Sequence, residues 1–459
     1  MNYSDFLERK ATLAPSTGFE PPAKFDLKRP LFDFQQDIVR WALRRGRCAL
    51  FEDCGMGKTA QQLTWANEVA KHTRKPVLIL APLAVAEQTK AEGADMGIEV
   101  DHVTQDSDCR DTGIAITNYE KMHRIDTDRY IGVAADESSC IKAMDSKTTA
   151  QMIETFANTP YKLACTATPA PNDYMELGNH AEFLGVMTRE EMLAMFFTHD
   201  SGNTSQWRLK GHAQDDFWRW LCSWAVNIRR PSDIGYDDGA FKLPPLNLYE
   251  HVVQSSQTME GYLFALPASS LEERRNARKA SLSERVEQAA KIANKSREQW
   301  IVWCNLNSES EALADEINGA VEVTGSDSED HKVAAVRGFL SGEHRVLISK
   351  PTIFGFGLNL QCCHNELFVG LSDSYEQFYQ AVRRCWRFGQ TKPVNAHLVI
   401  SDLEGAVLAN LKRKENDAKR MGEQMVKHMA DITSAEIRGS HRNTTVYKAE
   451  KPIALPSFL

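Results

Sequence analysis

The feature that most constrains the fold of this chain is a series of short, continuous apolar runs separated by stretches with helical periodicity. Continuous apolar runs, unlike alternating ones, are typical of strands covered on both faces of a parallel sheet. The first part of the chain contains "RCALFE" (47–52), "PVLILAP" (76–82), "GIAITNY" (113–119), "IGVAADE" (131–137) and "KLACTATP" (162–169). The second part contains "WIVWC" (300–304), "AVEVTG" (320–325), "RVLISK" (345–350), "ELFVGL" (366–371) and "VNAHLVI" (394–400). The pattern predicts an α/β protein with two parallel-sheet domains in tandem.

Residues 186–295, between the two series, lack this strand rhythm. Within them, "DDFWRWLCSWAVNIRR" has aromatic residues at helical spacing, which favours a packed helix between the lobes over a base-stacking platform. The prolines of "KLPPLN" indicate a junction. We therefore expect an N-terminal lobe over 1–245 with a helical insertion at about 186–245, a C-terminal lobe over 246–437, and a basic or polar tail over 438–459.

The segment "FEDCGMGKTA" (51–60) joins an apolar run to a helical pattern, as a phosphate-binding loop does. The loop pattern G-x-x-x-x-G-K-[ST] is matched from its last glycine onward, but Glu52 stands where the pattern has its first glycine. The residues expected to contact nucleotide are Gly55, Met56, Gly57, Lys58 and Thr59. Backbone N–H groups at the start of the helix would surround the phosphates, the lysine would contact the outer ones, and the threonine hydroxyl would hold magnesium.

A pair of acids follows the strand-like run "IGVAADE". An aspartate at that position, Asp136, is suited to coordinate magnesium, and the next residue, Glu137, is suited to align and deprotonate an attacking water molecule. The combination of loop and acid pair predicts a nucleotide-hydrolysing site.

These motifs, in this order, resemble those of the superfamily-two helicases, most closely their Swi/Snf-type DNA translocase branch. In that branch an acidic residue replaces the missing glycine, as Glu52 does here. The segment "RPLFDFQQDIVRWAL" resembles the motif whose glutamine reads adenine, which implies this role for Gln35. "ADESSCIK" resembles the acid box, with Ser138 in place of its usual alanine. "TATPAPNDYMELGNHAEFL" is similar to the coupling motif, with Thr166, Thr168, Pro169 and Asn172 in place.

The second half extends the resemblance. "FGFGLNLQ" resembles the family's glycine-leucine-asparagine motif and implies that Gly357 belongs to the nucleotide site. "YQAVRRCWRFGQ" matches the most diagnostic motif, at Gln380, Arg384, Arg387, Gly389 and Gln390. On a helix the first three of these would share one face, and the arginines would contact the γ-phosphate from the opposite lobe. The resemblance covers about residues 29–430. It implies two RecA-like lobes that bind ATP and Mg²⁺ between them and use hydrolysis to move along a nucleic-acid backbone.

Composition bears on the partners, the cysteine chemistry and the cellular location of the protein. The net charge of −8 argues against a general binder of polyanions, but a local basic cleft is compatible with it. The ten cysteines include no C-x-x-C pair, which favours reduced core residues over a zinc site or disulfides. The polar N-terminus is not a secretory signal, and no apolar run approaches the roughly 20 residues of a membrane helix. A motor of this size without added modules resembles bacteriophage and bacterial ones, so we expect a cytoplasmic location, in the host if the protein is viral.

Three functional hypotheses remain at this stage. The favoured one is a translocase on DNA, with duplex preferred to single strands and RNA less suitable. The others are a strand-separating DNA or RNA helicase, and a degenerate motor that serves as a scaffold. The scaffold is disfavoured because the expected site residues are intact, namely Lys58, Thr59, Asp136, Glu137 and Arg387. The sequence identifies no recruiting protein.

Overall fold

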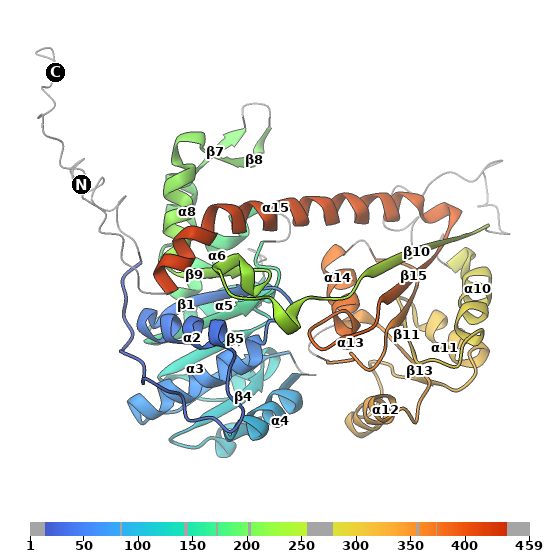
Figure 1. Ribbon diagram of the computed structural model, residues 1–459, viewed down its shortest axis with the longest axis horizontal. Coiled ribbons are helices and arrows are strands. Elements are labelled where there is room, and N and C mark those ends of the chain that lie inside the picture. The colour runs from blue at the N-terminus through green and yellow to red at the C-terminus, as the bar shows by residue number, and fades with distance from the viewer. Residues whose placement is uncertain are drawn as a thin grey trace, which may run out of the picture.

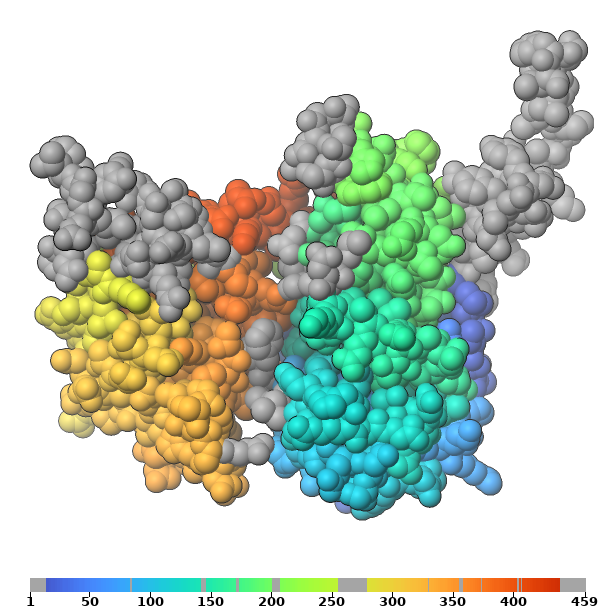
Figure 2. Space-filling view, turned by 180° about the vertical axis from the view of Figure 1, so that it is seen from behind, coloured from blue at the N-terminus to red at the C-terminus, as the bar shows by residue number. Residues whose placement is uncertain are grey.

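The computed structural model describes residues 14–82, 85–141, 146–170, 173–200, 203–254, 279–354, 358–372 and 374–437. Two α/β lobes lie next to one another, and one long helix crosses from one to the other (Figure 1). In Figure 2, seen from behind, the yellow-to-orange second lobe and the cyan-to-green first lobe are distinct masses.

The first lobe is built on a seven-stranded sheet in which every pair of neighbours is parallel. Its strands, in spatial order, are β3 (Val100–His102), β4 (Ile114–Asn118), β2 (Val77–Ala81), β5 (Gly132–Asp136), β6 (Tyr161–Thr166), β1 (Arg47–Glu52) and β9 (Ala225–Ile228). Because the strands are parallel, the ends of β1, β5 and β6 meet at one edge, where ligands bind in such sheets.

Helices cover both faces of this sheet, which explains why its strands are continuously apolar. One face packs against α2 (Asp33–Arg45), α3 (Lys58–Thr73) and α4 (Ala86–Met96). The other packs against α5 (Lys147–Thr155), α6 (Leu177–Leu184), α7 (Arg189–Phe196) and α8 (Gln214–Cys222).

The second lobe has a six-stranded parallel sheet. Its strands, in spatial order, are β10 (Leu246–Val253), β15 (Val394–Ser401), β14 (Asn365–Val369), β11 (Trp300–Cys304), β13 (Val346–Ser349) and β12 (Ala320–Glu322). Helices α10 (Leu282–Asn294) and α11 (Asn307–Glu316) cover one face. Helices α12 (Glu329–Ser341), α13 (Pro351–Phe354) and α14 (Tyr375–Cys385) cover the other. The two sheets confirm the expected pair of tandem parallel α/β domains.

The last helix, α15 (Gly405–Ile437), belongs to the cores of both lobes. Its first turns place Val407 and Leu411 in the core of the second lobe. Its later turns place Met425 and Met429 in the core of the first lobe. The segment 246–437, expected to form only the second lobe, therefore ends on the first one. None of the described helices, this long one included, is both long and apolar enough to cross a membrane.

The insertion at 186–245 is less helical than expected. It contains an antiparallel hairpin of β7 (Phe197–Asp200) and β8 (Asn203–Leu209), and its end supplies β9, which pairs with β1. The aromatic segment does form the packed helix α8, with Phe217, Trp218 and Trp220 buried. The run "AVNI" of β9 is too short to be recognised as a strand before its partner in the sheet is known.

Candidate active site between the lobes

The loop at 53–57 leaves the buried strand β1 and enters helix α3. Gly55 (φ 86°) and Gly57 (φ 82°) both lie in the left-handed region, which residues with a Cβ atom seldom adopt. A Cβ atom on Gly57 would lie 2.3 Å from Nε2 of Gln35, and one on Gly55 would lie 2.9 Å from the backbone nitrogen of Phe388. Both conformation and space therefore require these two glycines.

Glu52 occupies the position of the glycine that the loop pattern lacks, and it is still part of β1. Its side chain is fully buried, and its Oε2 atom accepts a hydrogen bond from Nε2 of Gln61 at 2.7 Å. Burial raises the pKa of Glu52 to about 7, although the nearby Lys58 ammonium and the Gln61 hydrogen bond act in the opposite direction. Because the strand continues through this position, no glycine is needed there.

Lys58 is the first residue of α3 and follows its N-cap, Gly57. Its Nζ atom donates to the backbone oxygens of Glu52 (2.7 Å) and Asp53 (3.1 Å). Among the described residues, no side chain caps the first turn of α3, so its backbone N–H groups are left for a ligand. Thr59, in the same turn, is partly buried. A helix N-terminus beside an ammonium group is suited to bind phosphate.

Gln35 lies against this loop, but its amide is engaged by the protein itself. Its Nε2 atom donates to the backbone oxygen of Met56 at 2.8 Å, and its Oε1 atom accepts from the backbone nitrogen of Phe32 at 3.0 Å. Only 4% of the side chain is exposed. Gln35 therefore links α2 to the phosphate loop, next to the place where a base would lie if the loop held a nucleotide.

The acid pair lies at the carboxyl end of β5. Burial, followed by the adjacent charge of Glu137, raises the pKa of Asp136 to about 7, while the Lys58 ammonium acts to lower it. Glu137 has a φ of 49° and is one of two non-glycine residues in the described part of the chain with a positive φ. Its Oε2 atom is buried and has no hydrogen-bond partner among the described residues. A strained backbone and an unsatisfied carboxylate oxygen together are typical of a residue positioned to act on a ligand.

On the opposite side of the cleft lies α14, and here the structure corrects one expectation. Gln380 and Arg384 lie one turn apart on this helix, but α14 ends at Cys385, and Arg387 lies in the turn that follows. That turn passes through Gly389, whose φ of 88° cannot continue a helix. Arg387 is therefore held by the turn and not by a shared helix face.

The two arginines of the motif have main-chain partners. Arg384 and Arg387 each donate to the backbone oxygen of Leu358 at 3.3 Å, and Arg384 also donates to Oε1 of Gln380 at 2.8 Å. Burial, followed by the charge of Arg384, lowers the pKa of Arg387 to about 10. A Cβ atom on Gly55 would lie 3.5 Å from Cβ of Arg387, so this residue lies directly beside the phosphate loop. A guanidinium group beside a phosphate loop favours a bound anion.

Sequence reasoning missed the closest polar contact between the lobes. Arg383, rather than Arg384, extends to the phosphate loop: its Nη2 atom lies 3.1 Å from Oδ1 of Asp53 and donates to the backbone oxygen of Cys54. The hydroxyl of Tyr379 donates to the same Asp53 oxygen. The spacing of four between Tyr379 and Arg383 was a usable signal, because it places them in one row on the helix, beside the row of Gln380 and Arg384.

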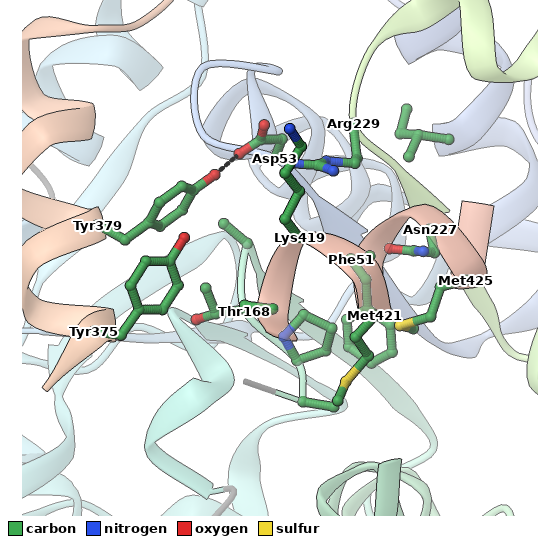
Figure 3. A pocket seen from close by; sticks show the side chains of 16 residues that line it. Phe51, Asp53, Thr168, Asn227, Arg229, Tyr375, Tyr379, Lys419, Met421 and Met425 are labelled. Atoms are coloured by element: carbon green, nitrogen blue, oxygen red, sulfur yellow. Dashed lines mark hydrogen bonds between the residues drawn. The ribbon is translucent and has the colours of Figure 1, made fainter. Parts of the chain in front are cut away.

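A second polar contact between the lobes involves the coupling motif. The Thr168 hydroxyl donates to Oε1 of Glu376 at 3.2 Å, and Thr166 accepts from the backbone nitrogen of Thr168 at 3.1 Å. Thr168 and Pro169 line a pocket between the lobes, closed on one side by α14 and on another by α15. Figure 3 shows Lys419, Met421 and Met425 of α15 entering this pocket opposite Tyr375 and Tyr379. Asn172 and Gly357, two further expected site residues, lie outside the described residues.

The expected metal ligands fit magnesium better than a metal held by protein alone. Thr59 offers a hydroxyl in the first turn of α3, and Asp136 offers a carboxylate at the end of β5, near the Lys58 ammonium. Among the described residues, no three His, Cys, Asp or Glu side chains are grouped so as to hold an ion. Mg²⁺ characteristically takes one or two protein oxygens and completes its shell with water and phosphate.

Family models match segments in both halves of the chain. A model described as an SNF2-related domain matches residues 34–199, and a model described as a helicase conserved C-terminal domain matches residues 283–389. The first match contains the phosphate loop and the acid pair, the second contains α14 and Arg387, and together they span more than half of the chain. No curated protein sequence matches the chain. Among solved structures, the chain is similar to the Sulfolobus solfataricus SWI2/SNF2 ATPase core in complex with dsDNA, at 17% identity and a TM-score of 0.44, over 91% of this chain and 99% of that one.

Proposed function

Because the chain belongs to the SNF2-type branch of the superfamily-two helicases, we propose that it hydrolyses ATP between its two lobes in order to move along duplex DNA. Membership of this family identifies the chain as a nucleic-acid-dependent ATPase. The observation that carries the finer proposal is the position of Arg387, from the second lobe, directly beside the phosphate loop that begins with β1 of the first. Neither lobe alone contains both halves of this site.

In the proposed site, the phosphates of ATP replace protein carbonyls as partners of Lys58. Its ammonium exchanges the backbone oxygens of Glu52 and Asp53 for the outer phosphates, while the N–H groups of the first turn of α3 surround them. Gln35 exchanges one of its two protein hydrogen bonds, to Met56 or from Phe32, for a contact with the adenine edge from α2. Thr59 and Asp136 would hold Mg²⁺, which when bound would neutralise charge on the phosphates.

Hydrolysis requires a base and a stabiliser for the charge that develops. Glu137 aligns a water molecule in line with the γ-phosphate and accepts its proton on a carboxylate oxygen. Arg387, supported by Arg384 and Gln380, offsets the negative charge that develops on the phosphoryl group as the bond breaks. Because these arginines belong to the second lobe, the reaction requires both lobes to be in place.

Loss of the γ-phosphate removes the link between the two half-sites, so each cycle changes how the lobes face one another. Each lobe holds the nucleic-acid backbone by polar and basic groups, and alternating contacts advance the motor along one strand. Because backbone contacts carry little sequence information, we expect little sequence preference and a steep dependence on salt.

The test is phosphate release measured with no polymer, single-stranded DNA, duplex DNA and RNA, over a range of salt concentrations. Duplex DNA is expected to stimulate at least as well as single strands, RNA to stimulate poorly, and stimulation to fall steeply as salt rises. A third strand in a DNA triplex is expected to be displaced in an ATP-dependent manner, while a forked duplex stays paired. Efficient opening of the fork, or stimulation by RNA alone, would identify a strand-separating helicase instead.

A cytoplasmic location is part of the same proposal. All ten cysteines are free thiols, and most are buried in the cores of the lobes. Such thiols are usual in proteins of a reducing compartment.

A further inference from the structure

We propose that Arg383 and Tyr379 are positioning residues that clamp Asp53, and with it the phosphate loop, to the second lobe before ATP binds. The inference rests on the proposed function, since it takes the loop at 53–57 to be the ATP site. It assigns roles to Asp53, Tyr379 and Arg383, which the sequence motifs did not identify as site residues.

Three donors converge on one carboxylate oxygen. Oδ1 of Asp53 lies 3.1 Å from Nη2 of Arg383, accepts the hydroxyl proton of Tyr379, and accepts from the backbone nitrogen of Cys54 at 2.7 Å. Figure 3 shows the Tyr379 hydroxyl directed at Asp53 from α14. The side chain of Arg383 is 3% exposed and that of Asp53 is 14% exposed. An ion pair this buried is screened little by salt, and removing either partner leaves the other poorly compensated.

Two aromatic rings orient the side chain of Arg383. Its guanidinium carbon lies 5.0 Å from the centre of the Trp386 ring and 5.8 Å from that of the Tyr379 ring. Such cation–π contacts fix the orientation of the planar group, so little further entropy is lost when it binds the loop. Lysine at this position would keep the charge but lose the paired, directed N–H groups.

The loop is held from both lobes at once. Lys58, from the first lobe, binds the backbone oxygens of Glu52 and Asp53. Arg383, from the second lobe, binds the Asp53 carboxylate and the backbone oxygen of Cys54. The clamp therefore constrains both the path of the loop and the distance between the lobes.

The same clamp determines where Arg387 lies. Arg387 follows Arg383 by four residues, and Phe388 packs on Gly55 of the loop. While Asp53 is bound, the turn with Arg387 stays opposite the phosphate-binding backbone. Without the clamp, the half-sites are linked in the absence of ATP only by the remaining contacts between the lobes, such as that of Thr168 with Glu376 and the packing of α15, and part of the binding energy of ATP is used for closure.

The experiment measures lobe spacing by small-angle X-ray scattering of the nucleotide-free full chain, together with KM and kcat for ATP. The variants are Arg383→Ala, Asp53→Asn, their combination, and Tyr379→Phe. The control is Arg40→Ala, which removes an ion pair to Asp37 within α2 and therefore changes no ion pair between the lobes. Thermal unfolding establishes that each variant is folded, and Tyr379→Phe, which loses only a hydroxyl, covers the case in which Arg383→Ala does not fold.

The clamp predicts a larger radius of gyration for Arg383→Ala and for Asp53→Asn, but not for Arg40→Ala. It predicts an increase in KM of roughly 30-fold for Arg383→Ala, as for truncation of one partner of a buried charged pair. The combined variant should be little worse than either single one, because both remove the same interaction, and Tyr379→Phe should change KM in the same direction by a smaller factor. Folded variants with unchanged scattering and unchanged KM would show that the pair only stabilises the fold. Since scattering requires no turnover, that result is distinct from a failure of nucleic acid to stimulate the wild-type protein.

Discussion

The two lobes contribute to one cleft in different ways. In the first lobe, the functional residues follow the ends of two strands and are held by neighbours close in sequence. Lys58 donates to the backbone oxygen of Glu52, and the backbone nitrogen of Glu137 donates to Oδ1 of Asp136. In the second lobe, they come from one helix and the turn after it. There, neighbours in sequence point in different directions: Arg383 binds the first lobe, while Arg384 binds Gln380 of its own helix.

This difference shows which parts of a site a sequence pattern specifies. Ends of parallel strands lie on one edge of a sheet, so residues there are brought together whatever their partners. A helix presents several rows of side chains, and the row that meets the other lobe depends on how the helix is packed. Four substitutions test this contrast, in order of decreasing expected effect.

Lys58→Ala tests the half-site of the first lobe. We expect loss of ATP turnover with the fold intact, because in the proposed site this side chain binds the phosphates from a helix N-terminus and it supports no core packing. The measurement is ATP hydrolysis at saturating nucleotide, with circular dichroism to establish folding. The matched control is Lys71→Ala, near the other end of α3, where the side chain is 52% exposed. Turnover equal to that of the control would exclude this loop as the active site.

Arg387→Ala tests the half-site of the second lobe. Nucleotide binding should be nearly normal, but hydrolysis should fall by roughly 10³-fold, since the charge matters most as the γ-phosphate leaves. Binding is measured by titration with a fluorescent nucleotide, and turnover by phosphate release. Arg337→Ala, an exposed arginine on α12, serves as control. If both variants hydrolyse ATP equally fast, the second lobe does not complete the site.

Glu137→Gln separates binding from chemistry within the first lobe. The variant should retain ATP but hydrolyse it on the order of 10²-fold more slowly, because an amide cannot accept the proton of the attacking water. Single-turnover hydrolysis and retention of ATP on the protein are the measurements, and the exposed Glu154→Gln is the control. Loss of ATP binding would instead point to a structural role for a residue whose backbone is strained.

Glu52→Gln tests how the burial of an acid behind the loop changes the free energy of unfolding with pH. Burial raises the pKa of Glu52 to about 7 from an ordinary value near 4.5. The folded protein therefore binds more protons than the unfolded chain between these two values, and the free energy of unfolding falls as pH rises through this window. The contribution is up to about 3 kcal/mol, at about 1.4 kcal/mol per pH unit.

For Glu52→Gln, the free energy of unfolding should fall less between pH 5 and pH 8 than it does for the wild type, as measured by denaturant unfolding at both pH values. Glu322→Gln, a partly buried acid in the second lobe, is the comparison. Equal slopes for the wild type and Glu52→Gln would show that Glu52 is charged at both pH values. The result sharpens the contrast between the lobes, because the second lobe places cations, not acids, against the loop.

Much of the fold followed from local pattern. All ten apolar runs became strands, from β1 to β15, because a run covered on both faces needs only its own side chains to be recognised. Five strands escaped prediction, namely β3, β7, β8, β9 and β10, and the last two illustrate how weak their local signals are. β9 has only four residues, and β10 is an edge strand in which Tyr249 and Val252 are exposed, so neither shows the continuous apolar pattern of a central strand.

The candidate site divides in the same way. Glycines with positive φ, a lysine at a helix start and acids at a strand end all express local backbone chemistry, so the loop from Gly55 to Thr59 and the acid pair could be predicted from the amino acids alone. Three features came from packing: α14 ends before Arg387, Arg383 rather than Arg384 binds Asp53, and α15 joins the two cores. These features depend on how separate elements are packed, and a contact between residues hundreds of positions apart leaves no periodicity in the sequence between them.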